Sequence, residues 1–132
     1  MKGLKDATLI DDTYNANSAS LKAALDVLAI FKGKSWVVLG AFGELGPNSP
    51  KIHEELGVLI KSSGVTRLMA VGADCKKTVE AFGVGATFFE EQQDLISALK
   101  KELEGDETIL IKGSRAQHME IVVAALVDDF RN

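Results

Sequence analysis

The sequence is poor in cysteine and has no long hydrophobic run, and both features exclude kinds of protein. Cys75 is the one cysteine among 132 residues, so no internal disulfide forms, and we expect a reducing, cytoplasmic setting. The apolar runs fall far short of the roughly 20 residues needed to cross a bilayer, and no signal-peptide pattern opens the chain. We therefore expect no membrane partner, and we interpret Cys75 as a packing residue at the start of a helix.

The sequence also has no excess of positive charge. Its 15 lysines and arginines are outnumbered by 19 aspartates and glutamates, which gives a net charge of −4. No basic stripe offsets phosphate repulsion, so we do not expect nucleic acid as a partner. The apolar fraction of 46% and the charged fraction of 26% are typical of a globular protein, and 132 residues make one domain of ordinary size.

Strand and helix signals alternate along the whole chain. Three of the strand signals are continuously apolar, which is typical of parallel strands covered on both faces. The sequence therefore predicts an α/β fold of the three-layer, Rossmann-like kind, with a mainly parallel sheet and helices on both faces. Antiparallel pairing is possible near residues 86–89 or at the C-terminal edge. The expected strands are residues 7–11, 35–40, 67–72, 86–89 and 108–112, and the expected helices lie at about 18–31, 50–63, 75–82, 92–104 and 114–130.

Polar side chains crowd the turn after the first expected strand. Residues 11–17 read Asp-Asp-Thr-Tyr-Asn-Ala-Asn and stand directly before a helical pattern. Aspartate and asparagine often cap helices and brace turns, and that structural explanation stays open for part of the segment. In an open α/β sheet, however, ligands bind beyond the carboxyl ends of the strands. This turn is therefore a candidate ligand site.

The loop after the second expected strand, residues 40–49, is rich in glycine. Its glycines are spaced G-x-x-G-x-x-G, and the next helix begins only at the end of the loop. A dinucleotide fingerprint needs the helix to begin within the motif, so we do not expect NAD binding. Glu44, the only charge in the loop, is either a ligand group or a solvated turn residue. His53, in the first turn of the following helix, is either a substrate contact or a packing residue.

The loop after the last expected strand reads Lys112-Gly113-Ser114-Arg115. Ser114, with Gln117 three residues on, predicts a capping box at the start of the final helix. Lys112 and Arg115 would oppose the helix macrodipole there. Two cations at such a place indicate that an anion is held by their side chains and by the helix N–H groups.

Taken together and in this order, the three loops resemble the C-terminal domain of the Mur ligases. That family carries a D-x-Y-N-A-N turn, here residues 12–17, and an E-L-G loop, here residues 44–46. A helix with an H-x-E pattern follows, which here begins at His53. The family also carries a K-G-S-R loop followed by M-E, which here are residues 112–115 and 119–120. Within the family, the pattern is most similar to the enzymes that join D-alanyl-D-alanine to UDP-N-acetylmuramoyl-tripeptide.

The resemblance implies that residues 1–132 are one domain of a longer, three-domain ligase of peptidoglycan precursor synthesis. Such an enzyme uses ATP and magnesium to turn the tripeptide carboxylate into an acyl phosphate, which the amine of D-alanyl-D-alanine attacks. This chain has no P-loop, so the absent central domain would bind most of the ATP and the magnesium, and the isolated domain is expected to be inactive. Ser18 and Ala41 depart from the family pattern, which usually has proline and aspartate at these positions.

The chemistry of the side chains divides the loops between ligands. Asparagine amides both donate and accept, which suits an adenine edge or ribose hydroxyls, and a tyrosine offers a flat face to a base or sugar. We expect no catalytic or metal-binding residue in this chain. The nucleotide-binding candidates are Asp12, Tyr14, Asn15 and Asn17, and the candidates for binding the peptide substrates are Glu44, His53, Lys112, Ser114 and Arg115.

A function of another class also fits some of these residues. Asp11, Asp12 and Lys112 resemble the acidic pair and lysine of a receiver-like or flavodoxin-like module that binds a small ligand without catalysis. A phosphorelay pattern, however, needs an aspartate at the end of the third strand, where this chain has Val71 and Gly72. Labelling with acetyl phosphate would separate the two functions.

Overall fold

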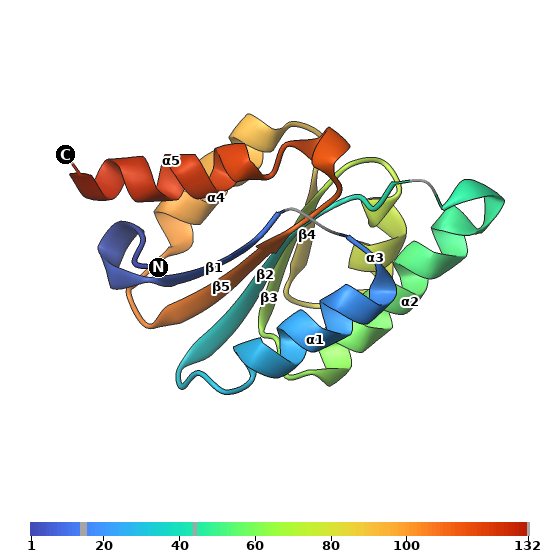
Figure 1. Cartoon of the computed structure of the whole chain (residues 1–132), viewed down its shortest axis with the longest axis horizontal. Coiled ribbons are helices and arrows are strands. Elements are labelled where there is room, and N and C mark those ends of the chain that lie inside the picture. The colour runs from blue at the N-terminus through green and yellow to red at the C-terminus, as the bar shows by residue number, and fades with distance from the viewer. Residues whose placement is uncertain (14–15, 44, 132) are drawn as a thin grey trace.

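Five strands form a single parallel sheet in a computed structural model, which describes residues 1–13, 16–43 and 45–131, with side chains up to residue 127 (Figure 1). Their order across the sheet is β1-β5-β2-β3-β4, and every neighbouring pair is parallel. The predicted strands are therefore confirmed, whereas the antiparallel pairing suggested for residues 86–89 is wrong. The strands are β1 (Thr8–Asp12), β2 (Lys34–Gly40), β3 (Arg67–Val71), β4 (Ala86–Phe89) and β5 (Glu107–Lys112).

Helices cover both faces of the sheet and complete the three predicted layers (Figure 1). One apolar core lies under α1 (Ser18–Leu28), α2 (Ser49–Ser62) and α3 (Cys75–Phe82). The other lies under α4 (Gln92–Glu102) and α5 (Glu120–Arg131). Within the described residues, no helix is long and apolar enough to span a bilayer.

The inner strand β5, which lies between β1 and β2, supplies side chains to both cores. Ile109 and Ile111 pack into the core under α4 and α5, whereas Leu110, between them, packs into the core under α1, α2 and α3. Successive side chains of a strand point to opposite faces, so the part of a strand that packs into a core on each side is apolar at consecutive positions, here Ile109, Leu110 and Ile111. This explains the continuous apolar run from which the strand was predicted.

The strand order excludes the flavodoxin-like and receiver-like alternative. In flavodoxin-type sheets the first strand lies inside the sheet, whereas here β1 is at the edge and β5 lies between β1 and β2. The third strand also ends at Val71, where a receiver would need its phosphoacceptor aspartate.

The final helix begins later than predicted. A 3-10 turn (Arg115–Gln117) follows β5, and His118 then takes the left-handed conformation, with φ 52° and ψ 45°. A residue in that conformation interrupts the helical hydrogen-bond ladder, so α5 starts only at Glu120. The predicted capping box is wrong, because the Ser114 side chain makes no capping hydrogen bond.

Candidate functional site

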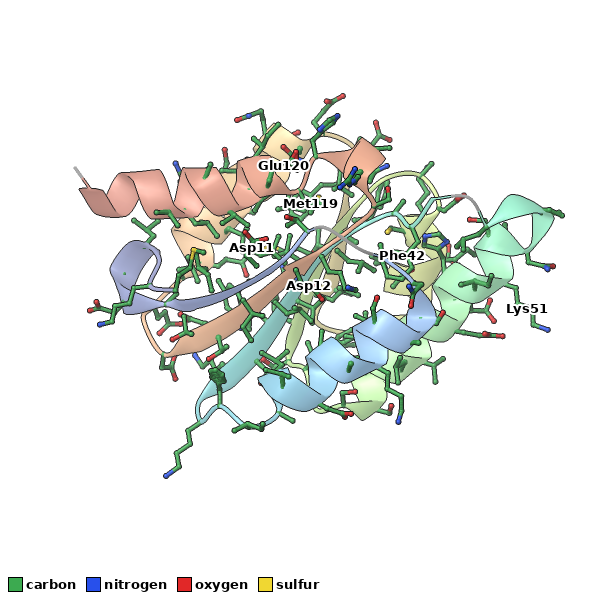
Figure 2. All side chains as sticks on the ribbon, in the orientation of Figure 1. Asp11, Asp12, Phe42, Lys51, Met119 and Glu120 are labelled. Carbon is green, nitrogen blue, oxygen red and sulfur yellow. The ribbon has the colours of Figure 1, made fainter. Side chains whose placement is uncertain are left out.

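The carboxyl ends of β1, β5 and β2 meet at one rim of the sheet. Asp12 is in register with Lys112, and Lys112 is in register with Leu39, one residue before the end of β2. Figure 2 shows Asp12, Phe42 and Met119, from three different segments, near this end of the sheet. The described parts of the three predicted loops therefore lie together. The candidates Tyr14, Asn15 and Glu44 lie outside the described residues.

An ion pair links the ends of β1 and β5. Nζ of Lys112 donates to Oδ2 of Asp12 at 2.7 Å, and the Lys112 side chain is fully buried while that of Asp12 is 33% exposed. Lys112 is the last residue of β5 and does not lie at a helix N-terminus, so the expectation that placed it there was wrong. Its ammonium group lies below the rim, where it fixes one oxygen of Asp12.

The turn after β1 is braced by its own side chains. Oδ1 of Asp11 accepts hydrogen bonds from the backbone N–H of Thr13 at 3.3 Å and from its hydroxyl at 2.9 Å. Oδ1 of Asn17 accepts from the backbone N–H of Ser20 at 2.8 Å, and Ser20 Oγ accepts from the N–H of Asn17 at 3.2 Å. Asn17 therefore caps α1 through Oδ1.

His53 holds the loop after β2 from inside the protein. Its ring is fully buried, and Nε2 accepts from the backbone N–H of Phe42 at 3.0 Å. The ring proton must then be on Nδ1, which lies 2.8 Å from the carbonyl oxygen of Ser49. The hydroxyl of Thr78 in turn donates to the carbonyl oxygen of His53 at 2.7 Å. Both ring nitrogens are thus used inside the protein, and the structure does not bring His53 to the surface of the site.

Close backbone packing joins the loops after β2 and β5. The N–H of Ser114 donates to the carbonyl oxygen of Ala41 at 3.3 Å. A Cβ atom on Gly113 would lie 2.7 Å from Cγ of Met119 and 3.0 Å from Cα of Gly40, so a larger residue would push the loops apart. The buried Met119 is thereby held against both loops.

A hollow of about 340 Å³ opens at this rim, lined by Thr13, Arg115, His118 and Glu120. Nδ1 of His118 lies 3.2 Å from Oε1 of Glu120, and both side chains are more than half exposed. The backbone N–H of Glu120, and then the His118 ring, hold the pKa of the Glu120 carboxyl below its usual value. The hollow therefore carries groups of both charges, which suits a small ligand that has an anionic and a cationic end.

Sequence reasoning found Arg115 but missed His118 and the role of its turn. Glu120 appeared only as part of the M-E pattern. A lone histidine inside an expected helix gave no sign that its backbone would be left-handed.

Two further predictions concern reactive groups. Cys75 is fully buried, and burial raises the pKa of its thiol to about 12, so its interpretation as a packing residue is confirmed. In the part of the chain that the structure describes, no group of three or more histidine, cysteine, aspartate or glutamate side chains could hold a metal ion.

Comparison with known proteins gives one consistent family. A family model described as "Mur ligase, glutamate ligase domain" matches residues 1–115. The UDP-N-acetylmuramoyl-tripeptide–D-alanyl-D-alanine ligase of Escherichia coli is 40% identical over 123 residues, which cover 92% of this chain and 27% of that enzyme. The enzyme of the same name from Bacillus subtilis is 30% identical over 132 residues, which cover 92% of this chain and 28% of that enzyme.

Solved structures agree with the sequence matches. MurF from Acinetobacter baumannii aligns with a TM-score of 0.80 and 34% identity, over 91% of this chain and 28% of that one. The MurF ligase from Thermotoga maritima in complex with ADP aligns with a TM-score of 0.81 over 94% of this chain and 29% of that one, at 24% identity, which is a likeness of fold. The chain thus spans a little over a quarter of the length of these relatives.

Proposed function

Because the chain belongs to the Mur ligase family, as a C-terminal domain, we propose that it is part of an ATP-dependent ligase that joins D-alanyl-D-alanine to UDP-N-acetylmuramoyl-tripeptide. The observation that carries this proposal is the 40% identity to the Escherichia coli enzyme of that name, over 92% of the chain. The rest of the ligase would be two further domains, one of which, the central domain, binds the phosphates of ATP.

The reaction we propose has two steps. The terminal carboxylate of the tripeptide attacks the γ-phosphorus of ATP, which forms an acyl phosphate and releases ADP. The amine of D-alanyl-D-alanine then attacks the acyl carbon, loses a proton, and expels phosphate as the amide forms. The acyl phosphate hydrolyses if water reaches it, so a domain that closes over the centre protects the intermediate.

We assign the turn after β1 to the nucleotide. One oxygen of Asp12 is fixed by Lys112, so the other is pre-oriented to accept a hydrogen bond from a ribose hydroxyl. Asn17 caps α1 through Oδ1, so its NH₂ group is not used by the cap, and Tyr14 and Asn15 stand between Asp12 and Asn17 in the sequence. The solved relative from Thermotoga maritima holds ADP, which supports a nucleotide in this fold.

We assign Arg115 to the carboxylate of the incoming dipeptide. A guanidinium group binds a carboxylate through two parallel hydrogen bonds, and Arg115 lines a hollow that also carries the carboxylate of Glu120. Ser114 lies beside Gly43, and Glu44 follows Gly43 in the sequence. We keep Ser114 and Glu44 as further candidates for binding this substrate. Lys112 and His53 act indirectly. Lys112 is buried and holds Asp12 at the end of β1, and His53 is buried and holds the loop after β2 through the N–H of Phe42.

The side chains described in this chain do not make a magnesium site by themselves. Such a site is built from carboxylate and water oxygens. The carboxylates described at the nucleotide turn already have partners, since Asp11 accepts from Thr13 and Asp12 binds the ammonium of Lys112. We therefore place magnesium on the central domain and derive no step through it.

Kinetics of the full-length ligase test the assignment of Arg115. The loss of a charge-assisted contact of about 1.5–3 kcal/mol predicts that Arg115→Ala lowers kcat/KM about tenfold to a hundredfold. A rise in the KM for D-alanyl-D-alanine supports the dipeptide carboxylate, whereas a lower kcat with unchanged KM moves Arg115 to the acyl phosphate. Lys101→Ala, which removes an exposed cation at the far end of α4, is the control. Unchanged kinetics in Arg115→Ala would remove this loop from the site.

A further inference from the structure

The side chain of Gln92, the first residue of α4, reaches across to the turn after β5. Its Nε2 atom donates to the carbonyl oxygen of Gln117 at 3.1 Å and to that of His118 at 3.2 Å. The same nitrogen lies 3.8 Å from Sδ of Met119. Both carbonyl oxygens only accept, so the NH₂ group, and not the amide oxygen, must face them. One side chain thus holds three consecutive residues of the turn.

That turn has a conformation that needs support. His118 is one of the few non-glycine residues with a positive φ, and such a backbone persists only where its surroundings fix it. Gly40 and Gly113 leave the space that Met119 fills, which fixes one side of the turn. The amide of Gln92 binds the carbonyl groups and fixes the other.

The turn held in this way carries the side chains of the site. Arg115 begins it and His118 ends it, and both line the hollow at the rim. We propose that Gln92 is a positioning residue for the dipeptide: by binding the carbonyl oxygens of Gln117 and His118, it sets the direction in which Arg115 faces the substrate. This inference rests on the proposed function of Arg115.

The neighbouring glutamine gives a matched control. Gln92→Met keeps the length of the side chain and removes both donors, whereas Gln93→Met makes the same change at the next, exposed position of α4. In the full-length ligase, we expect Gln92→Met to raise the KM for D-alanyl-D-alanine about fivefold or more, because two hydrogen bonds to the turn are lost. The KM for ATP stays the same, and Gln93→Met changes neither value. Gln92→Glu, which replaces the donor by an acceptor, gives the same pattern if the methionine variant does not fold.

A double variant separates positioning from general damage. If Gln92 acts through Arg115, adding Gln92→Met to Arg115→Ala costs no further activity on the dipeptide. Additive losses, or equal rises in the KM values of both substrates, would overturn the inference. It would also be overturned if Arg115→Ala raises the dipeptide KM while Gln92→Met behaves like Gln93→Met. If Arg115→Ala leaves that KM unchanged, the proposed function of Arg115 is what fails.

Discussion

The ammonium of Lys112 lies 2.7 Å from Oδ2 of Asp12 and joins the carboxyl ends of two adjacent strands, β5 and β1. The two partners are unequal, since Lys112 is fully buried whereas Asp12 is 33% exposed. If the carboxylate is removed, a positive charge stays buried without it. If the ammonium is removed, the carboxylate that remains is partly hydrated. The structure therefore makes Asp12 the partner whose loss costs more.

This asymmetry predicts the stabilities of two variants. Asp12→Ala lowers the free energy of unfolding by about 2–3 kcal/mol, because the buried ammonium loses its carboxylate. Lys112→Met lowers it by less, because methionine keeps much of the apolar stem and Asp12 still reaches water. Urea unfolding of both variants at pH 7 measures the difference. A larger loss in Lys112→Met would contradict this account of the pair.

The pair also marks where local sequence reasoning stopped. Runs of apolar and β-branched residues predicted the five strands, and three of these runs are continuously apolar, as is typical of strands covered on both faces. Which strands become neighbours, however, is a tertiary property. Only the insertion of β5 between β1 and β2 brings Lys112 beside Asp12, and no pattern near either residue encodes it.

The same limit explains the site. The three loops could be predicted because each follows a strand and carries side chains that the turn does not need. The late start of α5 could not be predicted, because the turn before it depends on tertiary contacts. Met119 packs against Gly40 and Gly113, and Gln92 donates to the carbonyl oxygen of His118. The cap at Asn17 could be predicted in part, since asparagine before a helical pattern is a common N-cap.

A buried carboxylate, Glu107, makes stability depend on pH. Burial alone would raise its pKa, but hydrogen bonds from the backbone N–H groups of Gly105 and Glu104 outweigh burial and hold the pKa below its usual value of 4.5. A depressed pKa in the folded state means that Glu107 stabilises the protein above about pH 4.5, and that this contribution is lost as the pH falls.

We therefore expect Glu107→Gln to be less stable than the wild type at about pH 7. The difference in free energy of unfolding should narrow as the pH falls from about 5 to about 3. Guanidinium unfolding across this range measures the gap. Glu104→Gln, at an exposed position of the same turn, is the control and shows little change. A gap that widens on acidification would show that the sign is wrong.

Cys75 should not react while the protein is folded. Its side chain is fully buried, and burial raises the pKa of the thiol to about 12. Almost no thiolate therefore forms at about pH 8. A chromogenic disulfide reagent is expected to label the chain only at the rate of unfolding, and fully in guanidinium. Rapid labelling without denaturant would place the thiol at the surface.

Two asparagines of the nucleotide turn should behave differently. Asn17→Ala removes the cap of α1 and lowers the free energy of unfolding by about 1 kcal/mol. Asn15→Ala, in the full-length ligase, is expected to raise the KM for ATP far more than the KM for D-alanyl-D-alanine. The reverse pattern of KM values would move this turn to the dipeptide.

The acceptor preference of the full-length ligase tests the central claim most directly. Phosphate release and amide formation are measured with ATP, UDP-N-acetylmuramoyl-tripeptide, and either D-alanyl-D-alanine or a single amino acid as acceptor. We expect turnover only with the dipeptide, and none from the 132-residue chain alone, which has no phosphate-binding P-loop. Turnover with a single amino acid in place of the dipeptide, or ligation by the isolated chain, would contradict the account.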